Sequence, residues 1–164
     1  NRIVPDCIRA WSDNHPAAIR NPLATRPWQH VLEPLSGYLR LAGMALQGER
    51  KINHQAYNFG PGSEVNQTVE ELLQAMTARW PNSSWVGGVD PTYLAASEAG
   101  LLKLSCEKAR TELNWRPSWG FEDTLAKTVD WYHAHAADSD FNAYTTSTEQ
   151  INDYCIENTK LGRI

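Results

Sequence analysis

The chain has 164 residues, of which 41% are hydrophobic and 21% charged, with a formal net charge of −4. This length suffices for one domain with its own core, and the acidic balance argues against a broad cationic face for nucleic acid. No apolar run approaches the ~18 residues of a membrane span. The cysteines Cys7, Cys106 and Cys155 are scattered and odd in number, which argues against a disulfide framework and favours a reducing, cytoplasmic setting.

The first elements follow from apolar spacing and turn residues. Apolar residues at positions 3, 4, 7, 8 and 11 share one helix face, so we predict a helix over 2–11. Asp13 to Pro16 form a turn signal, and a short strand is predicted over 17–20. The chain starts at Asn1 without a methionine, which is typical of a fragment or a trimmed product.

The segment 26–39, R-P-W-Q-H-V-L-E-P-L-S-G-Y-L, organises the chain. From Val31 the apolar positions 31, 35, 38, 39, 42 and 46 recur with a period near 3.6, which predicts a helix that ends near Gly48. Arg26 lies just before it, where a guanidinium could meet a phosphate or a carboxylate. The alternative is a buried helix with a surface arginine in front of it.

Further along, the pattern alternates between short strands and helices. A strand running into a glycine-rich loop is predicted over 56–62, and Thr68 with Glu71 forms a capping box that opens a helix ending before Pro81. Trp85–Val86 is predicted as a short strand closed by two glycines. The pair His133 and His135 lacks partners at ligand spacing, so we expect a helix surface and no metal site.

The C-terminal third is predicted to be mainly helical. A strand is expected over 101–104, followed by a helix over 107–113 that Ser105 could cap. A long helix is expected over 121–137 with Phe121, Leu125, Val129 and Tyr132 on its core stripe. A second capping box at Ser147 opens a terminal helix through Tyr154.

The segment 26–39 resembles a signature of CDP-glucose 4,6-dehydratases, nucleotide-sugar lyases of the extended short-chain dehydrogenase/reductase superfamily. Y-N-F-G at 57–60, the stretch 97–105 and E-L-N-W-R-P at 112–117 resemble other segments of these enzymes. The resemblance covers nearly the whole chain but only the second half of the enzyme. It implies an α/β fold, the C-terminal substrate-binding part of the superfamily fold, with helices around short strands and the N-terminal Rossmann half absent. It also implies that residues 1–164 form a single nucleotide-sugar-binding domain.

By resemblance, three residues lie near the diphosphate of a CDP-sugar: Arg26, Arg2 at a helix start, and Asn58 through its amide. Helix N-termini favour anions in any case. From the residues alone, Arg2 is equally a solvated terminal arginine and Asn58 part of an ordinary strand-to-turn segment. Ala95 and Ser105 replace a basic residue and an aspartate of the relatives, which implies a weaker grip on the diphosphate.

The resemblance places Ile19, Arg20 and Asn21 under the cytosine base, mostly through backbone contact, and Glu98 near the ribose hydroxyls. A carboxylate can accept two hydrogen bonds from such hydroxyls. A plain edge strand remains the alternative for residues 19–21. In the parent family NAD is the cofactor, and the expected setting is dideoxysugar synthesis for bacterial O-antigen and lipopolysaccharide.

The chemical machinery of that family is missing from this chain. No tyrosine is followed four places later by a lysine, and no G-x-G-x-x-G turn occurs. Without a tyrosine base and a hydride acceptor, we expect no catalytic residue here and no catalysis by the chain alone. We therefore expect exposed apolar surface and, besides a CDP-sugar, a missing N-terminal half or a homo-oligomer as partner. The alternatives are a stand-alone nucleotide-sugar-binding or structural module and a folded remnant that binds nothing.

Overall fold

The computed structural model describes residues 2–88 and 104–162, and residues 1, 89–103 and 163–164 lie outside this description. The chain divides into two compact units, each assembled from three separate segments. Unit 1 comprises Asn1–Arg26, Asn66–Leu102 and Leu125–Asn142, and unit 2 comprises Pro27–Val65, Lys103–Thr124 and Ala143–Ile164.

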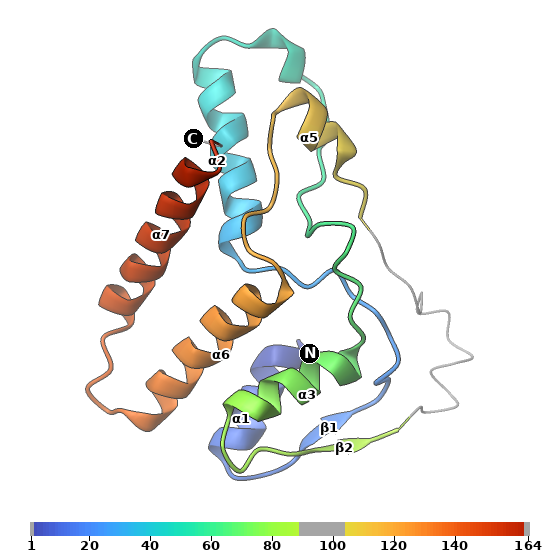
Figure 1. The fold of residues 1–164 in the computed structure, drawn as a ribbon, viewed down its shortest axis with the longest axis vertical. Coiled ribbons are helices and arrows are strands. Elements are labelled where there is room, and N and C mark those ends of the chain that lie inside the picture. Colours follow the sequence, from blue (N-terminus) through green and yellow to red (C-terminus); the bar gives the residue numbers. More distant parts are fainter. Residues whose placement is uncertain (1, 89–103, 163–164) are drawn as a thin grey trace. The chain divides into compact units, whose positions relative to one another are not determined.

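The described residues have a mixed α/β architecture (Figure 1). Six α-helices and one short 3-10 helix accompany one parallel pair of strands in this part of the chain. In chain order the elements are α1 (Ile3–Ser12), β1 (Ala17–Ile19), α2 (Leu32–Leu46), η1 (Arg50–Ile52), α3 (Val69–Arg79), β2 (Trp85–Gly87), α5 (Glu107–Glu112), α6 (Phe121–Ala137) and α7 (Ala143–Lys160). The expected helices over 2–11, 31–46 and 121–137 and both expected strands near 17–20 and 85–86 are confirmed.

Unit 1 has a core of helix side chains around tryptophan rings. The inward residues expected for α3, namely Val69, Leu72, Leu73 and Met76, are all buried, as are Leu125 and Val129 of α6. Trp80 lies 5.9 Å from the Trp11 ring and 5.1 Å from the His133 ring, measured between centroids. The capping box is present as expected, because the Thr68 hydroxyl accepts from the Glu71 N–H and the Glu71 carboxylate accepts from the Thr68 N–H.

Unit 2 is built around one face of α2. Its apolar core consists of Met44, Phe59, Ala109, Leu113 and Trp115. The Phe59 ring packs edge-on against Trp115 with 4.9 Å between centroids, and the Trp115 indole N–H donates to the Ser36 hydroxyl at 2.8 Å. These contacts fix α2 against the loop that follows α5.

A buried carboxylate joins α2 to the C-terminal part of unit 2. Glu33 accepts hydrogen bonds from the backbone N–H groups of Ser118 and Trp119, at 3.0 and 2.7 Å, and from the Tyr154 hydroxyl at 2.7 Å. Burial, with the Glu33 carboxylate close by, raises the pKa of Tyr154 to about 12. The chain before α6 and helix α7 thus meet at one point on α2.

The apolar stripe that predicted α2 is exposed. Val31, Leu35, Tyr38, Leu39 and Leu46 are all exposed, and the buried positions are Glu33, Gly37 and Met44 on the opposite side of the helix. The alternative of a buried helix with a surface arginine in front of it is therefore wrong for this side of α2. The exposed apolar side chains of α2 agree with the expectation that this chain exposes apolar surface.

Three further local predictions are wrong. Residues 56–59 form no strand and run through unit 2 without a partner strand among the described residues. Helix α7 begins at Ala143, so Ser147 lies inside it and is not its cap. Cys106, not Ser105, occupies the N-cap position of α5. The strand expected over 101–104 lies largely outside the described residues.

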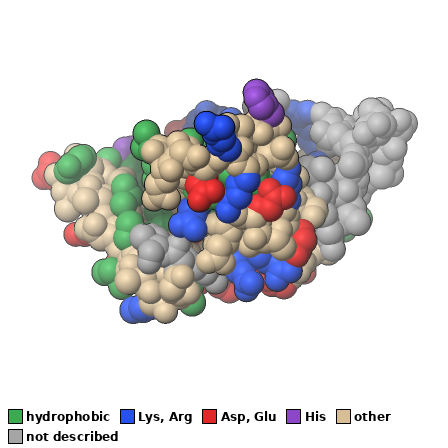
Figure 2. Space-filling model, turned by 90° about the horizontal axis from the view of Figure 1, so that it is seen from above, with side chains coloured by type: hydrophobic (Ala, Val, Ile, Leu, Met, Phe, Trp, Pro, Cys, Tyr) green, Lys and Arg blue, Asp and Glu red, His purple; other side chains and the backbone are tan. Residues whose placement is uncertain are grey.

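Two further features concern the described helices and the charges on one face of the molecule. None of these helices is long and apolar enough to cross a bilayer. On the face presented in Figure 2, basic and acidic side chains are interspersed and are not separated by sign. On helix α5, Glu107 and Arg110 form an ion pair one turn apart.

Candidate functional site

The carboxyl edge of the two-stranded sheet carries three of the expected substrate residues. Strands β1 and β2 are parallel, with Ile19 opposite Gly87, so the chain leaves both strands at the same edge. Arg20 is exposed there, and Ile19 and Asn21 are half-buried. In open α/β sheets, ligands bind beyond the carboxyl ends of the strands. This edge is therefore the best-built candidate site in unit 1.

Gly87 makes the close pairing at this edge sterically feasible. Its φ is +150°, and a Cβ atom at this position would lie 1.9 Å from the carbonyl oxygen of Ile19. Only glycine fits so close to a neighbouring backbone. Sequence reasoning treated Gly87 and Gly88 as a simple strand end, although a double glycine after a short apolar run is also a signal for close backbone approach.

The loop that carries Arg26 is held by the start of α3. The N–H groups of Val69 and Glu70 donate to the carbonyl oxygens of Ala24 and Pro22, both at 2.9 Å. Thr25 forms an antiparallel bridge with Thr68. Arg26 is half-buried, and its guanidinium donates to the Thr25 carbonyl oxygen at 2.8 Å. The backbone before the guanidinium is thus well fixed.

The N-terminus of α3 is not itself an anion site. Loop carbonyls and the Thr68 hydroxyl occupy its first N–H groups, and two acidic residues, Glu70 and Glu71, follow the cap. Hydrogen bonds from Thr68 lower the pKa of Glu71, so this carboxyl is ionised at neutral pH. An incoming phosphate would be repelled there, and the helix end serves to hold the Arg26 loop.

Arg2 lies at the other helix start of unit 1. It occupies the N-cap position of α1, has an extended backbone, and is exposed. Its carbonyl oxygen accepts from the Asp6 N–H at 3.0 Å, and Asp6 in turn pairs with Arg9. The side chain of Arg2 makes no capping hydrogen bond. The structure therefore places Arg2, residues 19–21 and Arg26 in the same unit.

Asn58 belongs to unit 2. Its side-chain amide is exposed and donates to the Ser105 carbonyl oxygen at 3.2 Å, which ties the segment 57–60 to the chain leading into α5. An amide nitrogen carries two hydrogens, so one donor remains for a phosphate oxygen. Glu98 lies outside the described residues.

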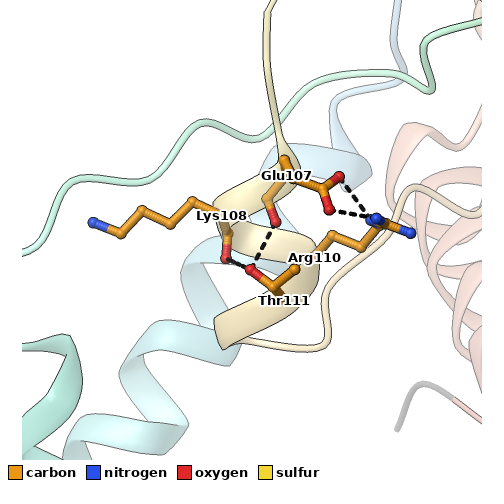
Figure 3. A network of polar contacts seen from close by, with 4 residues as sticks. All are labelled: Glu107, Lys108, Arg110 and Thr111. Atoms are coloured by element: carbon orange, nitrogen blue, oxygen red, sulfur yellow. Dashed lines mark hydrogen bonds and ion pairs between the residues drawn. The ribbon is translucent and has the colours of Figure 1, made fainter.

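Beside Asn58, helix α5 contributes a polar cluster that sequence reasoning did not identify. The Tyr57 hydroxyl donates to Glu112 at 2.7 Å, and the Lys108 ammonium lies 4.8 Å from the centre of the Tyr57 ring and donates to Gln55 at 2.6 Å. Figure 3 shows that Lys108 extends away from the Glu107–Arg110 pair on the same helix. No sequence signal links Tyr57 to Lys108, because they are far apart along the chain.

The described residues offer no metal cluster of His, Cys, Asp and Glu side chains. They also do not fit NAD. Strand β1 is followed by Arg20, Asn21 and Pro22 and not by a glycine-rich turn that opens a helix, and β2 is followed by Gly88 and then by undescribed residues whose sequence holds no G-x-G-x-x-G. We therefore derive no hydride-transfer step for this chain.

Comparison with known proteins gave consistent matches, although no family model matches the chain. It is 38% identical over 162 residues to a CDP-glucose 4,6-dehydratase of Salmonella typhimurium, which covers 98% of this chain and 43% of that relative. It is 29% identical over 117 residues to a dTDP-glucose 4,6-dehydratase of Streptomyces antibioticus, and 31% identical over 117 residues to that of Streptomyces niveus. These two matches cover 70% and 68% of this chain, and 31% and 30% of the respective relatives. The chain thus spans less than half the length of the curated relatives it matches, in their C-terminal part.

Proposed function

Because this chain is related by sequence to the sugar-nucleotide 4,6-dehydratases over nearly its whole length, we propose that residues 1–164 form the nucleotide-sugar-binding domain of a CDP-glucose 4,6-dehydratase. The observation that carries this proposal is the 38% identity over 162 residues. The parallel strand edge and the anchored Arg26 loop support it, since both present polar groups on fixed backbone.

The complete enzyme of this proposal converts CDP-glucose to CDP-4-keto-6-deoxyglucose and water with the help of NAD, in cytoplasmic synthesis of dideoxysugars for O-antigen and lipopolysaccharide. In this proposal, the chain binds the substrate and does not carry out the oxidation step. A nucleoside diphosphate carries two or more negative charges, and charge-assisted hydrogen bonds from guanidinium groups are the strongest single contacts that this chain offers to it.

In this proposal, Arg2 and Arg26 of unit 1 meet the diphosphate, and the backbone of 19–21 lies along the cytosine base. Asn58 of unit 2 is a separate candidate for a phosphate contact. Glu98 accepts hydrogen bonds from the ribose. Support for the base contact comes from Ile19, which is held at the sheet edge by its pairing with Gly87.

Isothermal titration with CDP, CDP-glucose and dTDP-glucose tests the proposal. We expect CDP-glucose to bind and Arg26→Ala to weaken binding by roughly 10- to 100-fold, which corresponds to the ~1.5–3 kcal/mol of a hydrogen bond to a charged group. Arg50→Ala is the matched control, because Arg50 is an exposed arginine of η1 outside the proposed site. Absence of heat with all three ligands at millimolar concentration would contradict substrate binding and favour a structural module.

A further inference from the structure

The segment 57–60 has no ladder of backbone hydrogen bonds to hold it, because it pairs with no strand among the described residues. Side-chain contacts hold it instead. The Phe59 ring packs edge-on against Trp115, and the Asn58 side-chain amide donates to the Ser105 carbonyl oxygen. The position of Asn58, the candidate phosphate contact of unit 2, therefore depends on a small number of such contacts.

Gln29 supplies one more contact, from the chain that leads into α2. Its side-chain NH2 group donates to the carbonyl oxygen of Phe59 at 3.1 Å. Both residues belong to unit 2. Because Phe59 directly follows Asn58, this hydrogen bond restrains the backbone within one residue of the Asn58 amide.

The residue after Gln29 places it firmly. His30 is buried, and its Nδ1 accepts from the Leu32 N–H at 3.3 Å. The His30 ring also packs edge-on against Trp119, with 4.9 Å between centroids. Gln29 thus donates to Phe59 from a fixed backbone, and the start of α2 determines where the segment 57–60 lies.

The oxygen of the Gln29 amide is left without a partner. Only the NH2 group can donate to a carbonyl, so the hydrogen bond to Phe59 determines the orientation of the amide. Oε1 is then buried, and no donor among the described residues reaches it. A buried acceptor without a donor lowers stability. A methionine would fill a similar volume without an unpaired oxygen, so stability alone does not explain a glutamine here.

We propose that Gln29 is a positioning residue that holds Asn58 in place for the diphosphate of a nucleotide sugar, an inference that rests on the proposed function. Gln29 acts through Phe59 and Asn58 and does not contact the ligand itself. An amide donor that is already in place loses less conformational entropy when a phosphate oxygen binds. The hydrogen bond from Gln29 therefore strengthens substrate binding.

A double-mutant cycle measured by isothermal titration with CDP-glucose tests this inference. We expect Gln29→Met to weaken binding by about fivefold or more, and Asn58→Ala by at least as much. In the Asn58→Ala background, Gln29→Met should change the affinity by less than about twofold, because the residue through which it acts is gone. Gln47→Met is the matched control, since Gln47 is an exposed glutamine at the end of α2. An equal effect of Gln29→Met in both backgrounds would overturn the inference.

The melting temperature separates positioning from a purely structural role. Gln29→Met removes the hydrogen bond to Phe59 and the unpaired oxygen together, so the two effects on stability oppose each other. We expect a shift within about 3 °C of the unmodified chain. A fall of more than about 10 °C would show that the amide mainly stabilises unit 2, and would count against the inference.

Gln29→Glu adds a pH profile that a general loss of structure would not produce. A protonated carboxyl can donate to the Phe59 carbonyl oxygen, whereas an ionised carboxylate cannot. We expect CDP-glucose to bind this variant about as tightly as the unmodified chain at roughly pH 5, and at least about fivefold more weakly at roughly pH 9. A constant ratio of the two affinities over this range would contradict the role of the donor.

A final measurement needs no ligand. The side-chain amide signals of Asn58 in a proton–nitrogen NMR spectrum are identified by their absence in Asn58→Ala. Gln29→Met should shift them, and Gln47→Met should not. Signals that stay unchanged in Gln29→Met would overturn the inference. If they shift but the unmodified chain binds no CDP-glucose, the positioning of Asn58 by Gln29 stands and the proposed function fails.

Discussion

At the scale of single residues, Glu33 is the polar group most deeply built into unit 2. Its side chain is fully buried and accepts from three donors that follow it in the chain by 85 to 121 residues. A buried carboxylate persists only where its oxygens are hydrogen-bonded. Glu33 therefore fixes where the segment before α6 and helix α7 meet α2.

We expect Glu33→Ala to reduce the free energy of unfolding by about 3–5 kcal/mol, because it leaves the N–H groups of Ser118 and Trp119 without their acceptor and the Tyr154 hydroxyl with Ser36 alone. Glu33→Gln keeps an acceptor and should cost less. Urea unfolding followed by circular dichroism measures both. Glu49→Gln, at an exposed position, should stay within about 0.5 kcal/mol. If Glu33→Ala lowered the free energy of unfolding by less than about 1 kcal/mol, the hydrogen bonds of this carboxylate would not be important for the stability of unit 2.

Tyr154 makes the stability of the fold depend on pH. Burial raises its pKa to about 12 from the ordinary value of 10.0, so the unfolded chain loses this proton first. The stability contributed by neutral Tyr154 is complete below pH 10 and is lost as the pH rises towards 12. We expect the unfolding free energy of the unmodified chain to fall by about 2–3 kcal/mol relative to Tyr154→Phe over that range. Parallel curves for the two proteins in alkaline urea titrations would contradict this.

At the scale of elements, two glycines of α2 have opposite roles. A Cβ at Gly37 would lie 2.3 Å from a ring carbon of Phe59, whereas a Cβ at Gly43 would meet no atom within 4 Å. We expect Gly37→Ala to cost about 1–3 kcal/mol through overpacking. Gly43→Ala should stabilise the helix by about 0.5–1 kcal/mol, because glycine lowers helix stability. Thermal melts of both variants test the pair, and equal shifts would show that α2 does not pack on Phe59 in this way.

The elements also show which local features can be predicted from the sequence. The Thr68 box lies directly before an apolar helix pattern, and the structure forms it; the similar pattern at Ser147 lies inside α7, because residues 143–147 include no glycine or proline to delay the helix. The apolar periodicity correctly predicted helix α2, but the apolar stripe lies on its exposed side. The side that packs in unit 2 includes a glycine and a glutamate, which an apolar pattern does not select. No local rule identifies Glu33 as buried, because its partners are more than 80 residues away.

The candidate site was predictable to the same extent. Ile19 was expected on a strand, and the strand is present. The role of Gly87 depends on the pairing of β2 with β1. The sequence alone does not show which strands pair. For Asn58, the amide was expected to face a phosphate, and its partner Ser105 follows from a contact between distant segments.

At the scale of the whole molecule, we expect no turnover. Incubation of this chain with NAD and CDP-glucose should give no 4-keto product, because neither a Tyr-x-x-x-Lys pair nor a glycine-rich dinucleotide turn is present in its sequence. Absorbance of the 4-keto sugar in alkali measures the product, and the Salmonella dehydratase is the positive control. Formation of product above the enzyme-free background would contradict the prediction that this chain does not catalyse the reaction alone.

The interleaving of the two units bears on how the chain folds as it leaves the ribosome. Unit 1 combines residues 1–26 with residues 125–142, and unit 2 combines residues 27–65 with residues 143–164, so neither is complete until residues beyond 124 have been made. Tyr154 is translated 121 residues after Glu33, a delay of roughly 6–24 s at 5–20 residues per second. During that interval Gly37 and Met44, which are buried in the folded unit, lack part of their covering, so we expect the nascent α2 to be prone to non-native association.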